Sequence, residues 1–257
     1  MKKRKKKGKL IFFLILFVIV IKVGTEYLDQ LDRQQTEQQP IAVKLDKMKS
    51  NGIANLKIID LSDANTVTDW SQLKAQVDGA YIKATEGATY INPKFKKYAL
   101  NALYKNIPVG FYHYFWPHGN VVDARQQAIH FYNAIRQFNY KLYPVLDIEE
   151  DNQHTSQEVC ADVIAFANEF KALSGHSIMI YSYPDYADRC LQDSRLSAYP
   201  LWIANYKVKQ PNDTMTWHKY AMWQYSDTTY VNGISNAVDG DLATVTIFLN
   251  PLSAPKK

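Results

Sequence analysis

The sequence predicts an α/β protein built as an irregular (β/α) TIM-like barrel, helix-poor in its second half and preceded by an N-terminal hydrophobic targeting helix. Three observations lead to this prediction. Short β-rich runs alternate with longer amphipathic runs, about eight β-rich runs are visible, and polar residues follow many of them. A doubly wound open sheet is the alternative. It is disfavoured because no glycine-rich turn follows the first run and the polar strand ends do not gather at one crevice.

The expected elements alternate regularly through the first half of the barrel. The expected strands are 56–61, 80–83, 109–115, 143–148, 178–183, 201–206, 220–225 and 237–242. The expected helices are 70–77, 95–106, 124–138 and 157–173. Because few residues separate the last three strands, little helix is expected between them.

Composition is that of a folded globular protein with a sizeable core, since 47% of the 257 residues are hydrophobic and 13% are aromatic. The net charge of +5 comes from the N-terminus, where seven of the 30 Lys and Arg residues lie within the first nine positions. The rest of the chain has 23 basic and 25 acidic residues, which gives it a formal net charge of −2. This distribution argues against a nucleic-acid partner, because the basic charge is terminal.

The basic cluster precedes an unbroken apolar run from Leu10 to Ile21, a layout typical of a membrane-targeting segment. Twelve apolar residues suit a signal peptide, whereas a full membrane span needs about 20. No clear Ala-x-Ala cleavage site follows, so a cleaved signal peptide and a retained anchor both stay open. In either case the chain beyond Thr25 should be exported to the cell envelope, on the periplasmic or extracellular side, membrane-anchored or secreted.

We divide the chain into four parts. Residues 1–25 are the signal peptide or membrane anchor, 26–54 a polar tether, 55–250 the barrel domain and 251–257 a tail. An ordinary disordered leader explains the second part equally well. We expect the exported domain to act as a monomer, with membrane contact only through an uncleaved N-terminal segment.

An apolar run that ends in Asp147 and Glu149 is the most informative segment. Burying a carboxylate is costly unless pairing or chemistry requires it. On a strand, these two side chains project to the same side, with Cα atoms about 6.6 Å apart. Repulsion and desolvation should then keep one acid protonated while the other is ionised, as acid-catalysed glycoside cleavage requires.

A cation site and a solvated loop are the alternatives. Because no histidine pair or cysteine cluster with ligand spacing lies nearby, we predict no metal and no cofactor.

Polar residues also follow the other expected strands, as at the active-site end of barrel enzymes: Asp60, Glu86, His113, Tyr181, Asn205, Gln224 and Asp239. We expect His113 to be a hydrogen-bonded core histidine and Glu86 to pair with Lys83. Aromatic rings near strand ends can stack on sugars while amides bond their hydroxyl groups. The expected substrate-binding residues are Tyr112, Tyr181, Trp202, Asn205, Trp223 and Gln224.

Seven ordered motifs span residues 56–245: Ile59-Asp60-Leu61-Ser62, 81–87, 108–115, 145–149, 200–204, 223–226 and Val238-Asp239. Together they resemble the glycoside hydrolase family 25 lysozymes. The resemblance implies an irregular β/α barrel that hydrolyses the β-1,4 bond between N-acetylmuramic acid and N-acetylglucosamine. Its partner would be the glycan strands of peptidoglycan.

By motif, Glu149 resembles the family's general acid, Asp147 its partner, and Asp60 and Asp239 the further catalytic acids. After Ser62 the family usually has His, an aromatic residue and Gln, whereas residues 63–65 of this chain are Asp, Ala and Asn. This departure concerns one groove wall. Two alternatives stay open: a peptidoglycan-binding pseudoenzyme, and a hydrolase of another N-acetylglucosamine polymer such as chitin. For the lysozyme we expect participation of the substrate's acetamido group and retention of configuration.

The chain has two cysteines, Cys160 and Cys190. In an oxidising compartment one bridge is possible, and we favour a disulfide that ties the helix after the catalytic strand to the loop after Tyr183. Two buried free thiols are the alternative.

Overall fold

The structure is a computed structural model that describes residues 54–249. The expected targeting segment 1–25, the tether up to residue 53 and the tail 251–257 lie outside the described residues. Within the described part of the chain, no helix is long and apolar enough to cross a membrane.

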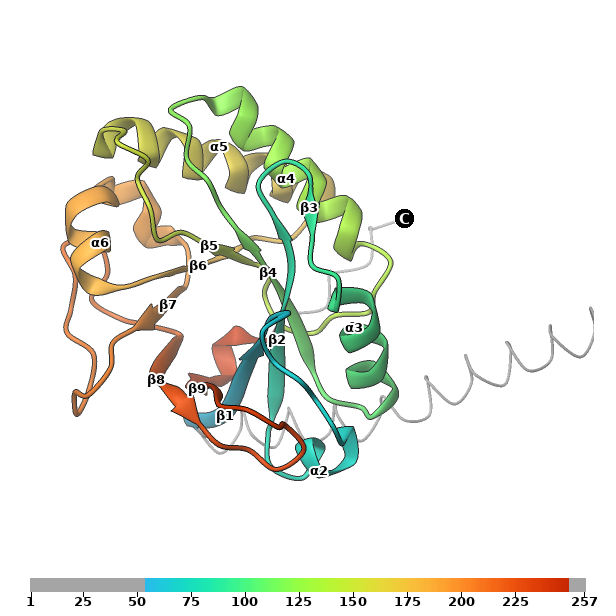
Figure 1. Cartoon of the computed structure of the whole chain (residues 1–257). Helices are drawn as coiled ribbons and strands as arrows, with labels where there is room; N and C mark the ends of the chain where they lie inside the picture. The colour runs from blue at the N-terminus through green and yellow to red at the C-terminus, as the bar shows by residue number, and fades with distance from the viewer. Residues whose placement is uncertain (1–53, 250–257) are drawn as a thin grey trace, which may run out of the picture. The chain divides into compact units, whose positions relative to one another are not determined.

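The described residues form a closed mixed barrel of eight strands (Figure 1). The strand order is β1-β9-β8-β7-β6-β5-β4-β2, and pairing of β1 with β2 closes the barrel. A short strand, β3, pairs with the end of β2. The strands are β1 (Ala54–Leu61), β2 (Gly79–Glu86), β3 (Tyr90–Ile91), β4 (Val109–Tyr114), β5 (Val145–Asp147), β6 (Met179–Ser182), β7 (Leu201–Ala204), β8 (Met222–Thr229) and β9 (Val238–Thr244). The predicted α/β barrel is confirmed.

Strand β9 runs against the rest of the barrel. It is antiparallel to both of its neighbours, β1 and β8, whereas the other barrel strands pair in parallel. An antiparallel neighbour can follow after a loop, so no crossover helix is needed between β8 and β9. This direction accounts for the helix-free β8–β9 connection, whereas β7 and β8 are parallel and are also joined without a helix. The second half of the barrel thus contains little helix, as predicted.

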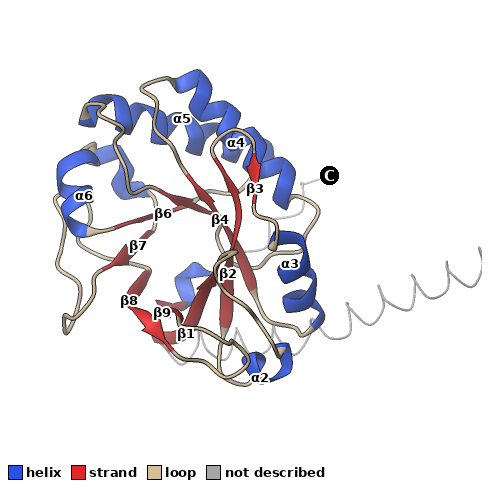
Figure 2. Ribbon diagram, in the orientation of Figure 1, coloured by secondary structure: helices blue, strands red, loops and turns tan. Residues whose placement is uncertain are grey.

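The helices lie outside the barrel, and α4 and α5 pack side by side (Figure 2). They are α2 (Trp70–Lys74), α3 (Phe95–Tyr104), α4 (Val121–Ile135), α5 (Ser156–Ser174) and α6 (Pro184–Cys190), with 3₁₀ turns η1 (Ser194–Ala198) and η2 (Val245–Ile247). The four expected helices are present, and α6 was not expected. Helix α5 begins with a capping box of Thr155 and Glu158 and ends at Gly175, whose φ of 74° suits glycine.

Alternation along the strands separates two apolar layers. One lies between the sheet and the helices and contains the rings of Phe131, Phe166 and Phe170. The other fills the barrel, where the Tyr81 and Trp202 ring centroids are 5.0 Å apart. Because this inner layer closes the barrel below, polar side chains gather at the carboxyl ends of the strands.

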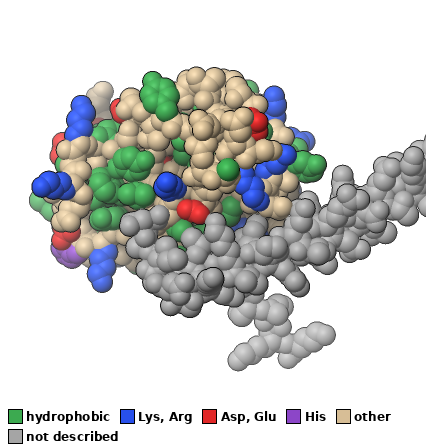
Figure 3. Space-filling view, turned by 90° about the horizontal axis from the view of Figure 1, so that it is seen from below, with side chains coloured by type: hydrophobic (Ala, Val, Ile, Leu, Met, Phe, Trp, Pro, Cys, Tyr) green, Lys and Arg blue, Asp and Glu red, His purple; other side chains and the backbone are tan. Residues whose placement is uncertain are grey.

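The visible part of one face of the molecule carries charges of both signs. On the face seen in Figure 3, Lys and Arg side chains lie among Asp, Glu and hydrophobic side chains rather than in one basic field.

The favoured disulfide is wrong. Cys160 and Cys190 are both buried and both free. The Cys160 thiol donates to the backbone oxygen of Cys190 at 3.3 Å, and the Cys190 thiol donates to Asp151 Oδ2 at 3.6 Å. Each sulfur is therefore directed at an oxygen acceptor and not at the other sulfur.

Gly110 is required by the packing inside the barrel. A Cβ at this position would lie 2.2 Å from Tyr81 Cε1 and 2.9 Å from Leu142 Cβ. Since Tyr81 is fully buried, its ring has no room to move. We expect Gly110→Ala to lower the free energy of unfolding by about 1 to 3 kcal/mol, measured by urea denaturation. The control is Gly79→Ala, whose nearest neighbours would lie at 3.1 Å, so its cost should be smaller. Equal costs would contradict this account.

Candidate active site

A cavity of about 230 Å³ opens at the carboxyl ends of the strands. Its lining includes all four predicted acids, and the full set is Asp60, Ser62, Asp63, Lys83, Tyr112, Tyr114, Asp147, Glu149, Tyr181, Trp202, Gln224 and Asp239. A second cavity, of about 320 Å³, is lined by Glu149, Tyr181, Tyr183, Pro184, Asp185, Ala204, Asn205 and Tyr206. Glu149 and Tyr181 line both cavities, so the two meet at these side chains.

The end of β5 positions the first pair of acids. Asp147 is the last residue of the strand, and the next backbone N–H, that of Ile148, still donates to Tyr181 O at 3.1 Å. Glu149 follows, and its backbone oxygen accepts a hydrogen bond from the Tyr183 hydroxyl at 3.3 Å. Ile148 is fully buried in the outer layer, while its two acidic neighbours both line the cavity. The structure therefore has the arrangement that strand alternation predicts.

Burial governs the acidity of this pair. It raises the pKa of Asp147 well above its usual value, and the charge of Glu149 raises it further. Burial also raises the pKa of Glu149, and its hydrogen bond with Asp147 partly offsets the increase. The pair therefore keeps one proton to higher pH than two isolated carboxyl groups would.

Asp60 and Asp239 form a second carboxyl pair on neighbouring strands. They are direct partners in the antiparallel register of β1 and β9. Burial raises the pKa of Asp60 well above its usual value, and the charge of Asp239 adds to the effect. Burial likewise raises the pKa of Asp239. Both predicted pairs thus face one cavity, and each favours retention of a proton.

Gln224 connects the second pair to the cavity wall. Its Nε2 donates to Asp60 Oδ2 at 2.9 Å. Its Oε1 accepts from the hydroxyl groups of Tyr181 at 2.8 Å and Tyr206 at 2.5 Å. These bonds fix the orientation of the amide and hold Tyr181, which lines both cavities.

The other predicted binding residues divide into two groups. Tyr112 and Trp202 line the first cavity and Asn205 lines the second. Trp202 is only 2% exposed, and its Nε1 donates to Asp241 Oδ1 at 2.8 Å. Trp223 lines neither cavity. It lies on the outer face of β8, packs against the outer layer and donates through Nε1 to the Asn205 backbone oxygen at 2.8 Å.

Several site residues were missed by sequence reasoning. Tyr114 and Asp63 line the first cavity, Tyr206 the second. Asp241 is buried beneath the cavity with its pKa raised by burial and then by the charge of Asp60. Alternation along β9 could have identified it, since it lies two residues after Asp239. Lys83 forms the expected ion pair with Glu86 at 2.7 Å, but its place in the cavity was not predicted.

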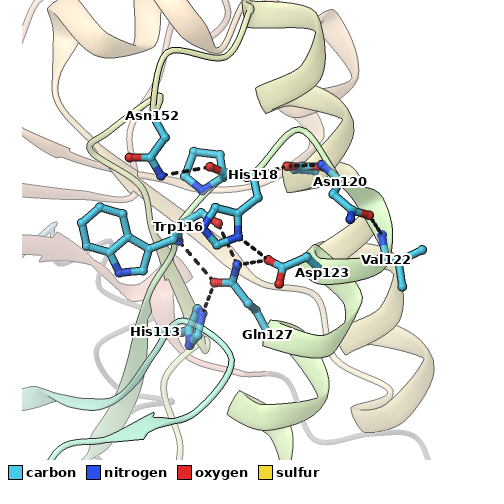
Figure 4. A network of polar contacts seen from close by, with 10 residues as sticks. His113, Trp116, His118, Asn120, Val122, Asp123, Gln127 and Asn152 are labelled. Carbon is cyan, nitrogen blue, oxygen red and sulfur yellow. Dashed lines mark hydrogen bonds and ion pairs between the residues drawn. The ribbon is translucent and has the colours of Figure 1, made fainter.

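His113 is confirmed as a hydrogen-bonded core histidine. It is fully buried, with Nδ1 2.8 Å from Thr85 Oγ1 and Nε2 3.1 Å from Gln127 Oε1 (Figure 4). Burial lowers the pKa of His113 to about 3, so the ring is neutral at ordinary pH. It supports the barrel and does not enter the cavity.

The sequence pattern of the family described as glycosyl hydrolases family 25 matches residues 59–234. The chain belongs to this family. The chain is similar to the autolytic lysozyme of Clostridium acetobutylicum, which is 32% identical over 187 residues that cover 72% of this chain and 55% of the relative. Lysozyme M1 of Streptomyces globisporus is 29% identical over 70% of this chain and 65% of its own length. This chain thus spans between half and two thirds of these two relatives.

A solved lysozyme structure superimposes well on this chain. The bacterial lysozyme from Streptomyces coelicolor matches with a TM-score of 0.68 and 28% identity, covering 73% of this chain and 91% of that one. The described domain therefore shares its overall fold with that lysozyme.

Asp241 should oppose folding at neutral pH. Its folded-state pKa is raised, so its contribution to stability is present below the unfolded pKa and is lost as pH rises through the folded pKa. We expect Asp241→Asn, which keeps an acceptor for Trp202, to raise Tm at pH 7, with the gain vanishing at about pH 4. Each kcal/mol gained corresponds to roughly 2 to 4 °C.

The control is Asp193→Asn at the surface. Hydrogen bonds from Arg195 lower the pKa of Asp193, so this variant should lower Tm at pH 7. Thermal unfolding followed by circular dichroism between pH 4 and pH 8 measures both. A gain for Asp241→Asn that is independent of pH would contradict the electrostatic explanation.

Proposed function

We propose that this chain is a lysozyme, a 1,4-β-N-acetylmuramidase that hydrolyses the bond between N-acetylmuramic acid and N-acetylglucosamine in peptidoglycan. One observation carries the proposal: Glu149 lines both cavities and its partner Asp147 lines the first, so a glycan strand that occupies both cavities would place a glycosidic bond beside these acids. Family membership supports it, as do relatives named as lysozymes.

In the first step Glu149 is the general acid. It lines both cavities, so it can reach the oxygen that joins a sugar in one cavity to a sugar in the other. In the free pair the shared proton favours Asp147, whose pKa is raised the more. An acetamido N–H donated to Asp147 favours its ionised form, which leaves the proton on Glu149 for that oxygen. Proton transfer and cleavage of the bond from the anomeric carbon release the leaving sugar with a free hydroxyl group.

The substrate's own 2-acetamido carbonyl oxygen attacks the anomeric carbon and forms an oxazolinium ion. Asp147 assists this attack by accepting the acetamido N–H. Its Oδ1 is buried and has no hydrogen-bond partner among the described residues, which leaves an acceptor for the substrate. The partner carboxylate also stabilises the positive charge that develops on the ring. Glu149 then takes a proton from water as the water opens the oxazolinium ion, and configuration is retained.

Asp60 and Asp239 contribute negative charge to the same cavity. Their pair lies on β1 and β9, whereas Asp147 and Glu149 follow β5, so the acids surround the cavity from separate strands. We propose that they stabilise the oxocarbenium-like transition state and bind sugar hydroxyl groups, with Gln224 fixing Asp60.

Sugar stacking is assigned to the more exposed tyrosines. Tyr112 and Tyr181 are each only 8% exposed, and Trp202 is more deeply buried still. Tyr114 and Tyr183 are half-buried, and Tyr206 is 37% exposed. Each of these three rings lines a cavity and can offer a face to a sugar. Trp202 instead supports Tyr181 through an edge contact at 4.8 Å.

The proposed substrate places the domain outside the cytoplasmic membrane, in the cell envelope. The basic N-terminal cluster and its apolar run fit this location as a signal peptide or a membrane anchor. The glycan strands of peptidoglycan are then the partner, and no nucleic acid is involved.

Glu149→Gln should abolish muramidase activity. The amide has no proton to donate, so release of reducing N-acetylmuramic acid ends from purified peptidoglycan should fall by about 100-fold or more. Mass spectrometry and reducing-end analysis measure the products. Glu169→Gln on α5 makes the same chemical change away from the cavity and should retain activity. If the folded wild-type protein binds peptidoglycan but releases no fragments, the proposed enzymatic function is wrong and the protein is a peptidoglycan-binding module.

The stereochemistry distinguishes the proposed chemistry from direct displacement by water. Acetamido participation gives two inversions and therefore net retention of the β-anomer. Proton NMR of a soluble muramyl oligosaccharide digest, recorded before mutarotation, should show the β-anomer first. Early α-anomer would exclude the oxazolinium route and would assign the opposing base to another carboxylate, such as Asp60.

A further inference from the structure

Lys83 is the only basic residue among those described as lining the two cavities. It projects from β2, and its side chain is 16% exposed. Its Nζ lies 2.7 Å from Glu86 Oε2 and 4.9 Å from the centroid of the Tyr114 ring. The ammonium group is therefore held at the wall of a cavity that otherwise collects carboxyl groups.

A chain of hydrogen bonds fixes the counter-ion of Lys83. One oxygen of Glu86 accepts from Lys83, and the other accepts from Trp116 Nε1 at 3.1 Å. The Trp116 backbone is clamped in turn by one amide: its N–H donates to Gln127 Oε1 at 3.2 Å, and its carbonyl oxygen accepts from Gln127 Nε2 at 2.7 Å (Figure 4). Both oxygens of Glu86 are thus committed, which restricts where Lys83 can lie.

The far end of this chain is anchored in the core. Gln127 is fully buried and also contacts His113 Nε2 and Asp123 Oδ2. Because His113 stays neutral at ordinary pH, its Nε2–H donates to Gln127 and its Nδ1 accepts from Thr85. His113, at the far end of the hydrogen-bond chain that holds Glu86, therefore carries no charge at ordinary pH.

The charges that face the Asp147–Glu149 pair come from several strands. Asp60 on β1, Asp239 on β9 and Glu150 beyond β5 are acidic. Tyr112, Tyr114, Tyr181 and Tyr183 have raised pKa values and are neutral. Lys83 on β2 is the cation that opposes these acids, and it lowers the pKa of both members of the pair.

We propose that Lys83 is a positioning residue whose ammonium group, fixed by Glu86 and Trp116, keeps one carboxylate of the Asp147–Glu149 pair ionised while the other carries the proton. Without this cation, neighbouring acids and burial would favour protonation of both carboxyl groups. The consequence for catalysis rests on the proposed lysozyme function, because acid-catalysed glycoside cleavage needs one protonated and one ionised carboxyl group in the same site.

Two variants within the same ion pair should shift the pH dependence in opposite directions. Lys83→Met removes the cation, so the pair keeps its protons to higher pH and both limbs of the kcat profile move up by roughly half a pH unit or more. Glu86→Gln removes the anion that partly neutralises Lys83, so both limbs should move down. A loss of structure in either variant would not produce shifts of opposite sign.

Two readouts test this. The first is kcat against pH for peptidoglycan cleavage by the whole protein. The second is a titration of the ¹³C-labelled Asp and Glu carboxyl groups by NMR, which needs no activity. Lys83→Arg should keep the wild-type limbs because it preserves the charge. Lys97→Met, which removes an exposed charge on α3, should leave both readouts unchanged.

Each outcome decides between roles. Opposite shifts in both readouts support the proposal. A raised KM with unshifted limbs in Lys83→Met would make Lys83 a substrate-binding residue and would overturn it, as would shifts of the same sign in both variants. If the wild type cleaves no glycan, the proposed function fails, and the NMR titration still tests whether Lys83 sets the charge of the pair.

Discussion

The burial of carboxyl groups at one end of a closed barrel is the constraint on which the rest of the structure depends. Asp60, Asp147 and Asp241 are each at most 7% exposed. A buried charge without donors would unfold a small domain or stay neutral. Here the strands supply donors, with Gln224 bonding Asp60 and Trp202 bonding Asp241. These hydrogen bonds lower the free-energy cost of burying the ionised carboxyl groups but do not remove it. The remaining cost is seen as the raised pKa values of these acids.

Closure of the barrel makes this arrangement possible because it fixes the register of every strand. Asp60 and Asp239 meet only because β9 returns antiparallel beside β1. Below them Tyr81 and Trp202 fill the interior, and Gly110 gives Tyr81 its room. Beneath the acids the packed rings and the buried Asp241 leave little exposed surface, so the cavity is the open side of the site. The geometry of the site is thus a consequence of packing inside the sheet.

Sequence reasoning succeeded where a local pattern determines structure. Alternation after a buried strand was enough to place Asp147 and Glu149 on one side, and the βα runs gave the strands in order. Strand direction leaves no local signal, so the antiparallel β9 was not foreseen. Trp223 and Gln224 are adjacent, so only one of them can face inward, and composition alone could not choose between them. The cysteine prediction was wrong because two thiols close in space can still point at separate oxygen atoms.

Lys83 was missed for a related reason, since an Lys–Glu pair three residues apart has an ordinary surface explanation. What distinguishes it is tertiary: β2 carries the ammonium into the cavity while Glu86 is held by Trp116 from β4's far end. The same network reaches Gln127 and the neutral His113 in the core. Residues that look like packing from the sequence therefore determine where the cation lies. A cation held this way can balance two carboxyl groups only as long as the core behind it stays rigid, which links the packing of the outer layer to the charge of the site.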